Sequence, residues 1–98
     1  MKTQGDYVSV KINGEEKYRY SLSENVNTFI YTGENDSQEN RLVIENGQAY
    51  ISEATCPDKI CVGHKPVKNV NESIVCLPHK VVIEIVSEGT ENAPDVVV

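Results

Sequence analysis

The chain predicts an all-β fold: a small antiparallel barrel or sandwich of about six to seven strands, built from hairpins, with little or no helix. Three observations predict it. Apolar residues recur at every second position along most of the chain, and two Asn-Gly pairs interrupt this alternation as hairpin turns do. No segment combines a sustained helical period with helix caps.

Length and composition indicate a single domain with a modest core. The chain has 98 residues, with no tryptophan and one phenylalanine, so the core must come from Val, Ile, Leu and Tyr. We expect the domain to span residues 7–86. Residues 1–6 are then an N-terminal leader segment, and residues 87–98 are a polar C-terminal tail.

The first two strands form a clear hairpin. Residues 7–12 alternate strictly between apolar and polar side chains, and in residues 17–22 tyrosine and leucine alternate with charged or polar side chains. Asn13-Gly14 lies between these segments. Both central positions of a type I′ turn need a positive φ, which Asn and Gly tolerate, so we predict two antiparallel strands joined by a tight turn.

The middle of the chain predicts a third strand and a second hairpin. Residues 26–32 are rich in β-branched and aromatic side chains, and the polar residues 34–40 follow as a surface loop. Residues 41–45 and 48–52 then flank a two-residue turn at Asn46-Gly47. This turn brings four apolar side chains to one face in two opposed pairs: Ile44 with Ala49, and Leu42 with Ile51.

The last two strands are the most apolar. Residues 73–77 and 81–86 are nearly continuous in hydrophobicity, and Pro78-His79-Lys80 joins them. Such continuity is typical of strands that are covered on both faces, so we expect both strands to be central.

One short helical turn fits within residues 58–62. Residues 96–98 either lack fixed structure or add an edge strand.

Charge disfavours several kinds of partner. The net charge is −6, and no segment gathers Lys and Arg into a stripe, so neither a nucleic acid nor an anionic membrane surface is expected as a partner.

No run approaches the ~18 apolar residues of a membrane-spanning helix. No pair of acidic residues is spaced to act as a general acid and base. We expect a monomer without enzymatic activity and without a cofactor.

The residues that carry chemistry gather between positions 56 and 79. This segment holds all three cysteines, Cys56, Cys61 and Cys76, together with both histidines. Reduced cysteines that fill space in a core are the simplest interpretation, because cysteine is among the most buried residue types. Three chemical interpretations stand beside it.

The first chemical interpretation is a disulfide. Four residues separate Cys56 from Cys61 and include the turn-forming pair Pro57-Asp58, so their Cα atoms can come within the ~4.4 to 6.8 Å that a bridge needs. A bridge from Cys76 would close a longer loop and stabilise the fold more. Three cysteines leave one unpaired, and the sequence does not determine the connectivity.

The second interpretation is a metal site and the third is a redox or catalytic thiol. Cys56, Cys61, Cys76 and His79 supply four ligands, and Cys-x2-His spacing lets two ligands on a turn converge on one tetrahedral ion. A Rieske iron–sulfur centre is less favoured, because no histidine stands two residues after Cys56.

The redox thiol is the weakest interpretation, because Cys-x4-Cys lacks the Cys-x-x-Cys geometry that lowers a thiol pKa.

The loops around the cysteines are expected to form a surface. Pro57, Asp58, Pro78 and His79 shape these loops, and a histidine in a tight turn is exposed by default. His64 lies between Gly63 and Lys65 and is expected to be a solvated loop residue.

Two segments of the chain carry a recognisable pattern. One is Ile51-Ser52-Glu53-Ala54 before Cys56-Pro57-Asp58-Lys59-Ile60-Cys61, and the other is Ile74-Val75-Cys76-Leu77-Pro78-His79-Lys80 before Val82-Ile83-Glu84-Ile85. With these motifs, roughly residues 18–86 resemble the NusG domain II-like domain, named after a second domain inserted in the elongation factor NusG of some thermophilic bacteria. The resemblance implies a compact all-β domain, usually found alone in small bacterial proteins whose N-terminus carries a membrane anchor or signal.

The resemblance implies no activity. The sequence shows neither a NusG N-terminal domain nor a KOW-type C-terminal domain, so we do not expect a role in transcription. We expect a non-enzymatic, extracytoplasmic, envelope-associated domain that binds or scaffolds an unknown protein partner and contains a structural cysteine cluster. It would contact the membrane only through an N-terminal anchor that this chain lacks. The alternative is a metal-binding or thiol-redox accessory module of a cell-envelope flavin or electron-transfer system.

Overall fold

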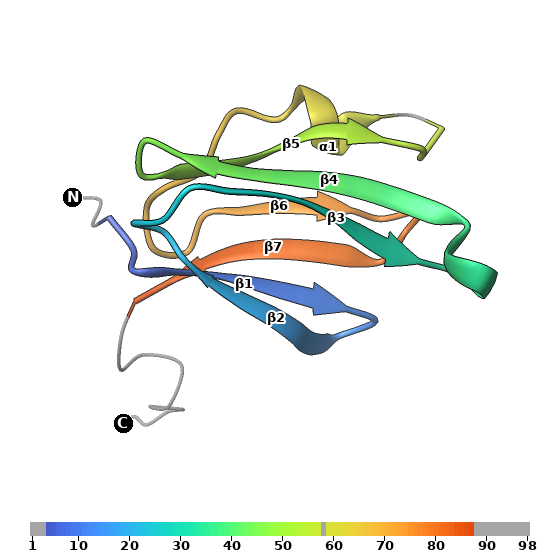
Figure 1. Cartoon of the computed structure of the whole chain (residues 1–98), viewed down its shortest axis with the longest axis horizontal. Coiled ribbons are helices and arrows are strands. Elements are labelled where there is room, and N and C mark those ends of the chain that lie inside the picture. Colours follow the sequence, from blue (N-terminus) through green and yellow to red (C-terminus); the bar gives the residue numbers. More distant parts are fainter. Residues whose placement is uncertain (1–3, 58, 88–98) are drawn as a thin grey trace.

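The computed structural model describes residues 4–57 and 59–87, and it confirms an all-β fold. Within these residues two antiparallel sheets pack face to face as an open sandwich (Figure 1). The strands are β1 (Tyr7–Ile12), β2 (Glu15–Ser21), β3 (Val26–Thr32), β4 (Gln38–Glu45), β5 (Gln48–Ala54), β6 (Ser73–Cys76) and β7 (Val81–Val86). One sheet has the order β2-β1-β7-β6 and the other β3-β4-β5.

Helical structure is limited to two short elements. A 3-10 turn, η1 (Glu34–Asp36), precedes β4, and α1 (Ile60–Gly63) contacts β5 and β6. The position of α1 agrees with the short turn expected within residues 58–62. None of the helices in the described part of the chain has the length and apolar character needed to cross a membrane.

Both Asn-Gly hairpin turns are confirmed. The φ angles are 55° at Asn13 and 85° at Gly14, and 55° at Asn46 and 76° at Gly47, as a type I′ turn requires. The predicted pairs in the second hairpin form in the predicted register: Ile44 opposite Ala49, and Leu42 opposite Ile51. Turn chemistry and side-chain alternation therefore suffice to fix this pairing.

The core lies between the inner faces of the two sheets. Val8 and Val10 of β1 are opposite Ile85 and Ile83 of β7, and all four are buried. The inner residues of β4 and β5 cover them from the other sheet, together with Ile30 of β3. Interdigitation of β-branched side chains from two sheets is the usual core of a sandwich.

The expectation that both apolar C-terminal strands are central is wrong for β6. Among the described residues this strand pairs with β7 alone and forms an edge of its sheet, and Val75 on it is 45% exposed. β7 does lie between β1 and β6. A continuous apolar run indicates that side chains are hydrophobic, but it does not indicate how many strands lie beside the run in the sheet.

Part of the segment expected to precede the domain belongs to the fold. Gly5 is buried and donates its backbone N–H to the carbonyl of Lys68 at 2.8 Å, and Asp6 donates to the carbonyl of Val86 at 2.9 Å. Gln4 also forms a β-bridge with Asn69. Residues 1–3 and 88–98 lie outside the described residues, including the proposed edge strand at 96–98.

The close packing of Gly5 predicts that even a methyl group is not tolerated there. A Cβ atom at Gly5 would lie 2.2 Å from Ile85 Cγ2 and 3.0 Å from the Val86 carbonyl oxygen. We expect Gly5→Ala to lower the free energy of unfolding by about 1 to 3 kcal/mol, measured by urea denaturation. Gly63→Ala is the matched control, since a Cβ there would meet no atom within 4 Å apart from its chain neighbours and the backbone of its own helix. Equal stability of the two variants would contradict the packing of residues 4–6 in the fold.

Candidate functional site: a buried sulfur cluster

Two parts of the chain that are separated in the sequence bring the cysteines together. Cys56 lies in the loop after β5, Cys61 lies in α1, and Cys76 ends β6. Their Sγ atoms all lie within 4.8 Å of one another. The three residues are 0%, 1% and 3% exposed. The cysteines therefore form one cluster inside the core, which we call the sulfur cluster.

The sulfur cluster contains no disulfide in this structure. The Sγ atoms of Cys56 and Cys61 are 3.7 Å apart, well beyond the ~2.05 Å of an S–S bond. All three cysteines are free thiols. The disulfide considered from the sequence is therefore not shown, and the sulfur atoms meet by non-bonded contact.

Asn40 of β4 connects the sulfur cluster to His79. Its side chain is fully buried, its Nδ2–H donates to Cys61 Sγ at 3.5 Å, and its Oδ1 accepts from Nδ1–H of His79 at 2.8 Å. The sequence analysis missed Asn40, because it assigned residues 34–40 to a polar loop, whereas β4 begins at Gln38. Its position could have been predicted, because side chains alternate along a strand and Asn40 lies two residues before the inward-facing Leu42.

His79 is buried and does not lie on the surface of its turn as expected. It is 5% exposed, because its ring bonds to Asn40 inside the protein. Among the described residues, the group whose ligand atoms converge contains the three sulfurs and not His79. Pro57 and Pro78 are exposed, as predicted for loop residues. Asp58 lies outside the described residues.

His64, the other histidine, is an exposed loop residue, as expected. Its Nδ1 lies 2.7 Å from the carbonyl oxygen of Lys65. It therefore belongs to the loop after α1 and takes no part in the sulfur cluster.

Burial makes the Cys56 and Cys61 thiols poor nucleophiles. It raises the pKa of Cys61 to about 12, and contact with the other two thiols acts in the same direction. Burial also raises the pKa of Cys56, against the opposing effects of Cys61 and the backbone N–H of Lys59. Both thiols therefore keep their protons near neutral pH, and a reactive thiolate is not formed.

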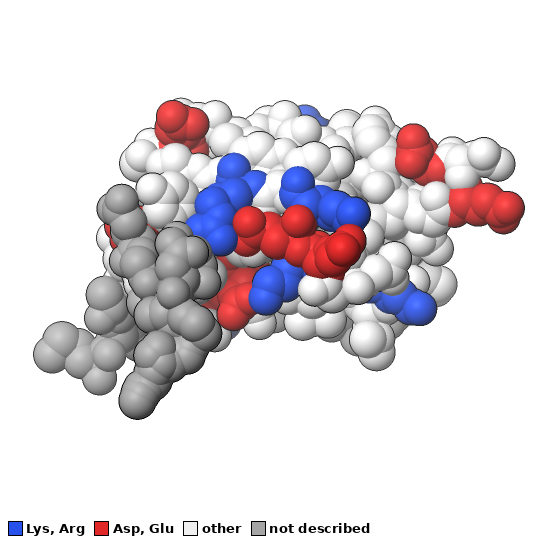
Figure 2. All heavy atoms as spheres, turned by 90° about the horizontal axis from the view of Figure 1, so that it is seen from below, with Lys and Arg blue, Asp and Glu red and all other residues white. Residues whose placement is uncertain are grey.

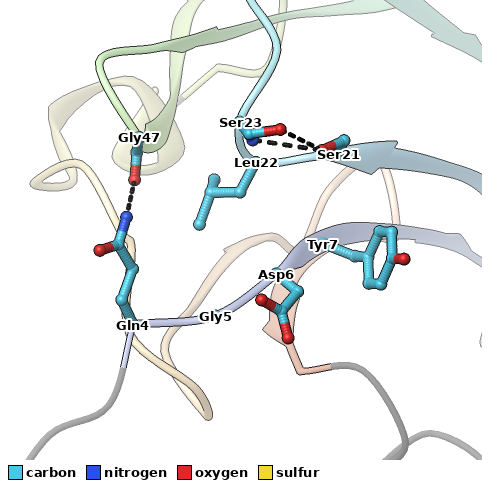
Figure 3. Close-up of a pocket in the computed structure, with 8 residues that line it drawn as sticks. All are labelled: Gln4, Gly5, Asp6, Tyr7, Ser21, Leu22, Ser23 and Gly47. Carbon is cyan, nitrogen blue, oxygen red and sulfur yellow. Dashed lines mark hydrogen bonds between the residues drawn. The ribbon is translucent and has the colours of Figure 1, made fainter.

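Two hollows lie in the surface of the described residues. One, of about 450 Å³, lies between residues 4–7, residues 21–23 and Gly47; Figure 3 shows Gln4 reaching the Gly47 carbonyl, which accepts its Nε2–H at 3.3 Å. Its serine hydroxyls, on Ser21 and Ser23, hydrogen-bond to each other at 2.8 Å. Neither this hollow nor the second one, on the outer face of the β2-β1-β7-β6 sheet, is lined by a cysteine or a histidine.

The outer face of the four-stranded sheet carries interleaved charges. Figure 2 shows basic and acidic side chains side by side on this face. Lys11 pairs with Glu84 at 3.1 Å, and Arg19 pairs with Glu16 at 2.7 Å. The cations of these pairs are thus held by carboxylates of the same sheet, and they do not form a basic stripe.

The outer face of the three-stranded sheet carries aromatic side chains. Phe29 and Tyr31 lie on the edge strand β3, with ring centroids 6.0 Å apart, and they are 38% and 47% exposed. The Arg41 guanidinium lies 5.5 Å from the Phe29 ring centroid and pairs with Glu53 at 3.0 Å. We call Phe29, Tyr31 and Arg41 the aromatic face.

The fold and the site define a small two-layer β-sandwich with a buried three-cysteine cluster. The sequence model of NusG domain II matches residues 1–89. The chain belongs to the NusG domain II family, which confirms the resemblance seen in its cysteine motifs.

Solved structures share this fold. A DUF1312 family protein from Ruminococcus gnavus is 36% identical, the match covers 84% of this chain and 99% of that chain, and the TM-score is 0.72. The Lin0431 protein from Listeria innocua is 26% identical over 84% of this chain and 95% of its own, with a TM-score of 0.71. A DUF1312 family protein from Enterococcus faecalis, 19% identical over 84% of this chain and 97% of its own with a TM-score of 0.72, is similar in fold alone. No protein with a curated description matches the chain.

The raised pKa of Cys61 predicts a loss of stability at alkaline pH. In the folded protein this thiol keeps its proton up to a pH of about 12, whereas the unfolded chain releases it near the ordinary pKa of 9.0. The stability that this difference contributes is fully present below pH 9.0 and is lost as the pH rises toward 12. We expect the melting temperature of reduced, chelator-treated protein to fall progressively above pH 9.0.

Cys61→Ala is the control for this experiment. Tyrosines titrate in the same range, and the pKa values of Tyr20 and Tyr50 are also raised, so the wild-type curve alone is not diagnostic. The alkaline decline should be shallower in Cys61→Ala. Parallel curves for the two proteins would show that Cys61 is not responsible.

Proposed function

We propose that this chain is a non-enzymatic, extracytoplasmic domain that binds or scaffolds a protein partner, with Cys56, Cys61 and Cys76 as its internal structural cluster. The observation that carries the proposal is the aromatic face. Its stacked rings are exposed on an edge strand beside an arginine, and aromatic residues and arginine are enriched at protein interfaces.

The interior of the domain supports a role without catalysis. The Cys56 and Cys61 thiols are buried and keep their protons, because burial raises the pKa of each, and His79 is hydrogen-bonded to Asn40. No cysteine or histidine lines either of the two hollows described above, and the Ser21 and Ser23 hydroxyls in the first are hydrogen-bonded to each other. The same raised thiol pKa values weigh against a thiol-redox module, because thiol–disulfide exchange needs an accessible thiolate.

The paired charges on the opposite face support a protein partner over a nucleic acid. Lys11 and Arg19 are neutralised by neighbouring carboxylates, and the chain has a net charge of −6. Binding to phosphates would have to break these pairs and overcome the overall repulsion. The family resemblance supports the placement outside the cytoplasm, because it implies a domain that is usually found in small bacterial proteins whose N-terminus carries a membrane anchor or signal.

A variant of the aromatic face tests the partner proposal. We would cross-link the native full-length gene product in its host cells and identify the partner by mass spectrometry, comparing the wild type with the double variant Phe29→Ser, Tyr31→Ser. Tyr18→Ser is the matched control, since Tyr18 is 45% exposed on β2, in the other sheet. We expect the double variant to weaken binding of the identified partner by about 30-fold, or about 2 kcal/mol. Equal loss in the control, or no loss in either, would exclude the aromatic face as the binding surface.

Labelling of intact cells tests the placement. Lys17 is exposed, so a membrane-impermeant amine reagent should modify the protein when it lies outside the cytoplasmic membrane. We expect labelling before lysis, with a cytoplasmic protein left unmodified in the same cells. Labelling that appears only after lysis would place the domain in the cytoplasm.

A further inference from the structure

We propose that Cys56, Cys61 and Cys76 bind one soft metal ion whose coordination three sulfur ligands can complete, and that this ion is Cu(I). The inference goes beyond the proposed function, because a binding or scaffolding domain needs no metal. It rests on the geometry of the sulfur cluster and on the hydrogen-bond donors that face it.

The sulfur atoms are already close to the spacing that a shared ion requires. Metal–sulfur bonds are about 2.3 Å long, so three sulfurs around one ion lie roughly 4 Å from one another. The Cys56 and Cys61 sulfurs are 3.7 Å apart, and no pair in the cluster exceeds 4.8 Å. The largest contraction needed is thus under about 1 Å.

Two N–H groups are directed at the sulfur atoms. The amide of Asn40 donates to Cys61, and the backbone N–H of Lys59 donates to Cys56. Thiolates that hold a metal carry negative charge, and N–H donors around them offset part of it. The buried Asn40 amide is hydrogen-bonded at both ends, and its N–H already faces a sulfur atom that would carry negative charge once an ion is bound.

His79 positions the amide that faces the cluster. Because Nδ1–H of His79 donates to Asn40 Oδ1 at 2.8 Å, the Nδ2–H of the same amide is left to point at Cys61 Sγ. The histidine acts through Asn40, as a partner that orients a donor to a ligand. It is a positioning residue in this proposal and not a ligand.

The number and kind of ligands select the ion. Sulfur donors favour soft ions, among them Cu(I) and zinc. Zinc sites in proteins are almost always four-coordinate, and iron–sulfur clusters commonly use four cysteines. In the described residues the converging group has three sulfur atoms, and they are buried away from water that would complete a fourth position. Cu(I) is stable with three thiolate ligands. Its binding displaces thiol protons to solvent and needs no oxidant or reductant.

Direct loading of the wild-type chain tests the proposal without a mutation. The reduced full chain, without oxygen, would receive Cu(I) as its acetonitrile complex, in competition with a Cu(I) chelator. We expect native mass spectrometry to show one copper per chain, and X-ray absorption to show three sulfur neighbours at about 2.3 Å. Failure to retain copper, a shell with two sulfurs, or a nitrogen neighbour would overturn the three-sulfur site. Tighter binding of Zn²⁺ with a nitrogen neighbour would replace it by the four-ligand site with His79.

Substitutions then test the individual residues. Asn40→Asp keeps an oxygen for His79 and removes the N–H that faces Cys61, so we expect Cu(I) affinity to fall by about 10- to 100-fold. His64→Ala is the control, because His64 is exposed and outside the cluster, and its affinity should be unchanged. Cys76→Ser should abolish three-sulfur coordination if it folds, as checked by circular dichroism. Unchanged affinity in folded Cys76→Ser and in Asn40→Asp would overturn the proposal, and if Cys76→Ser does not fold, the absorption result on the wild type decides.

Discussion

The register of β4 on β5 is the constraint on which both the core and the sulfur cluster depend. The Asn46-Gly47 turn fixes this register and directs the inner side chains of the hairpin into the sandwich. Because side chains alternate along β4, Asn40 shares the inward face of Leu42 and Ile44, and a slip of one residue would turn these side chains outward. A bulge between Arg41 and Leu42 then sets Ala54 opposite Asn40, so the loop that contains Cys56 begins beside the buried amide.

The buried polar groups link parts of the chain that the backbone pairing leaves separate. Asn40 belongs to one sheet, His79 lies in the turn between β6 and β7 of the other sheet, and Cys61 lies in α1. The net contribution of each hydrogen bond to the free energy of unfolding is only about 1 kcal/mol, whereas leaving one of these groups unpaired inside the protein would cost about 1 to 3 kcal/mol. The network therefore acts mainly by penalising other arrangements of the loops around the cysteines.

The two outer faces differ in what they offer to another molecule. The four-stranded sheet presents charges that are paired with one another, and such exposed pairs contribute little to stability or to attraction of a partner. The three-stranded sheet presents stacked rings on its edge strand. A protein partner would remove these rings from water and gain hydrophobic free energy.

The sequence by itself determined the strands, the hairpin turns, the register at Asn46-Gly47 and the family, because alternation, turn chemistry and cysteine motifs are local properties. It also identified the cysteines as the chemistry-bearing residues. Only the tertiary structure decided that β6 is an edge strand, that residues 4–6 belong to the fold, that His79 is buried, and that Asn40 faces Cys61. These features depend on which segments meet across the sandwich, and contacts between segments far apart in the sequence leave no periodic signal along the chain.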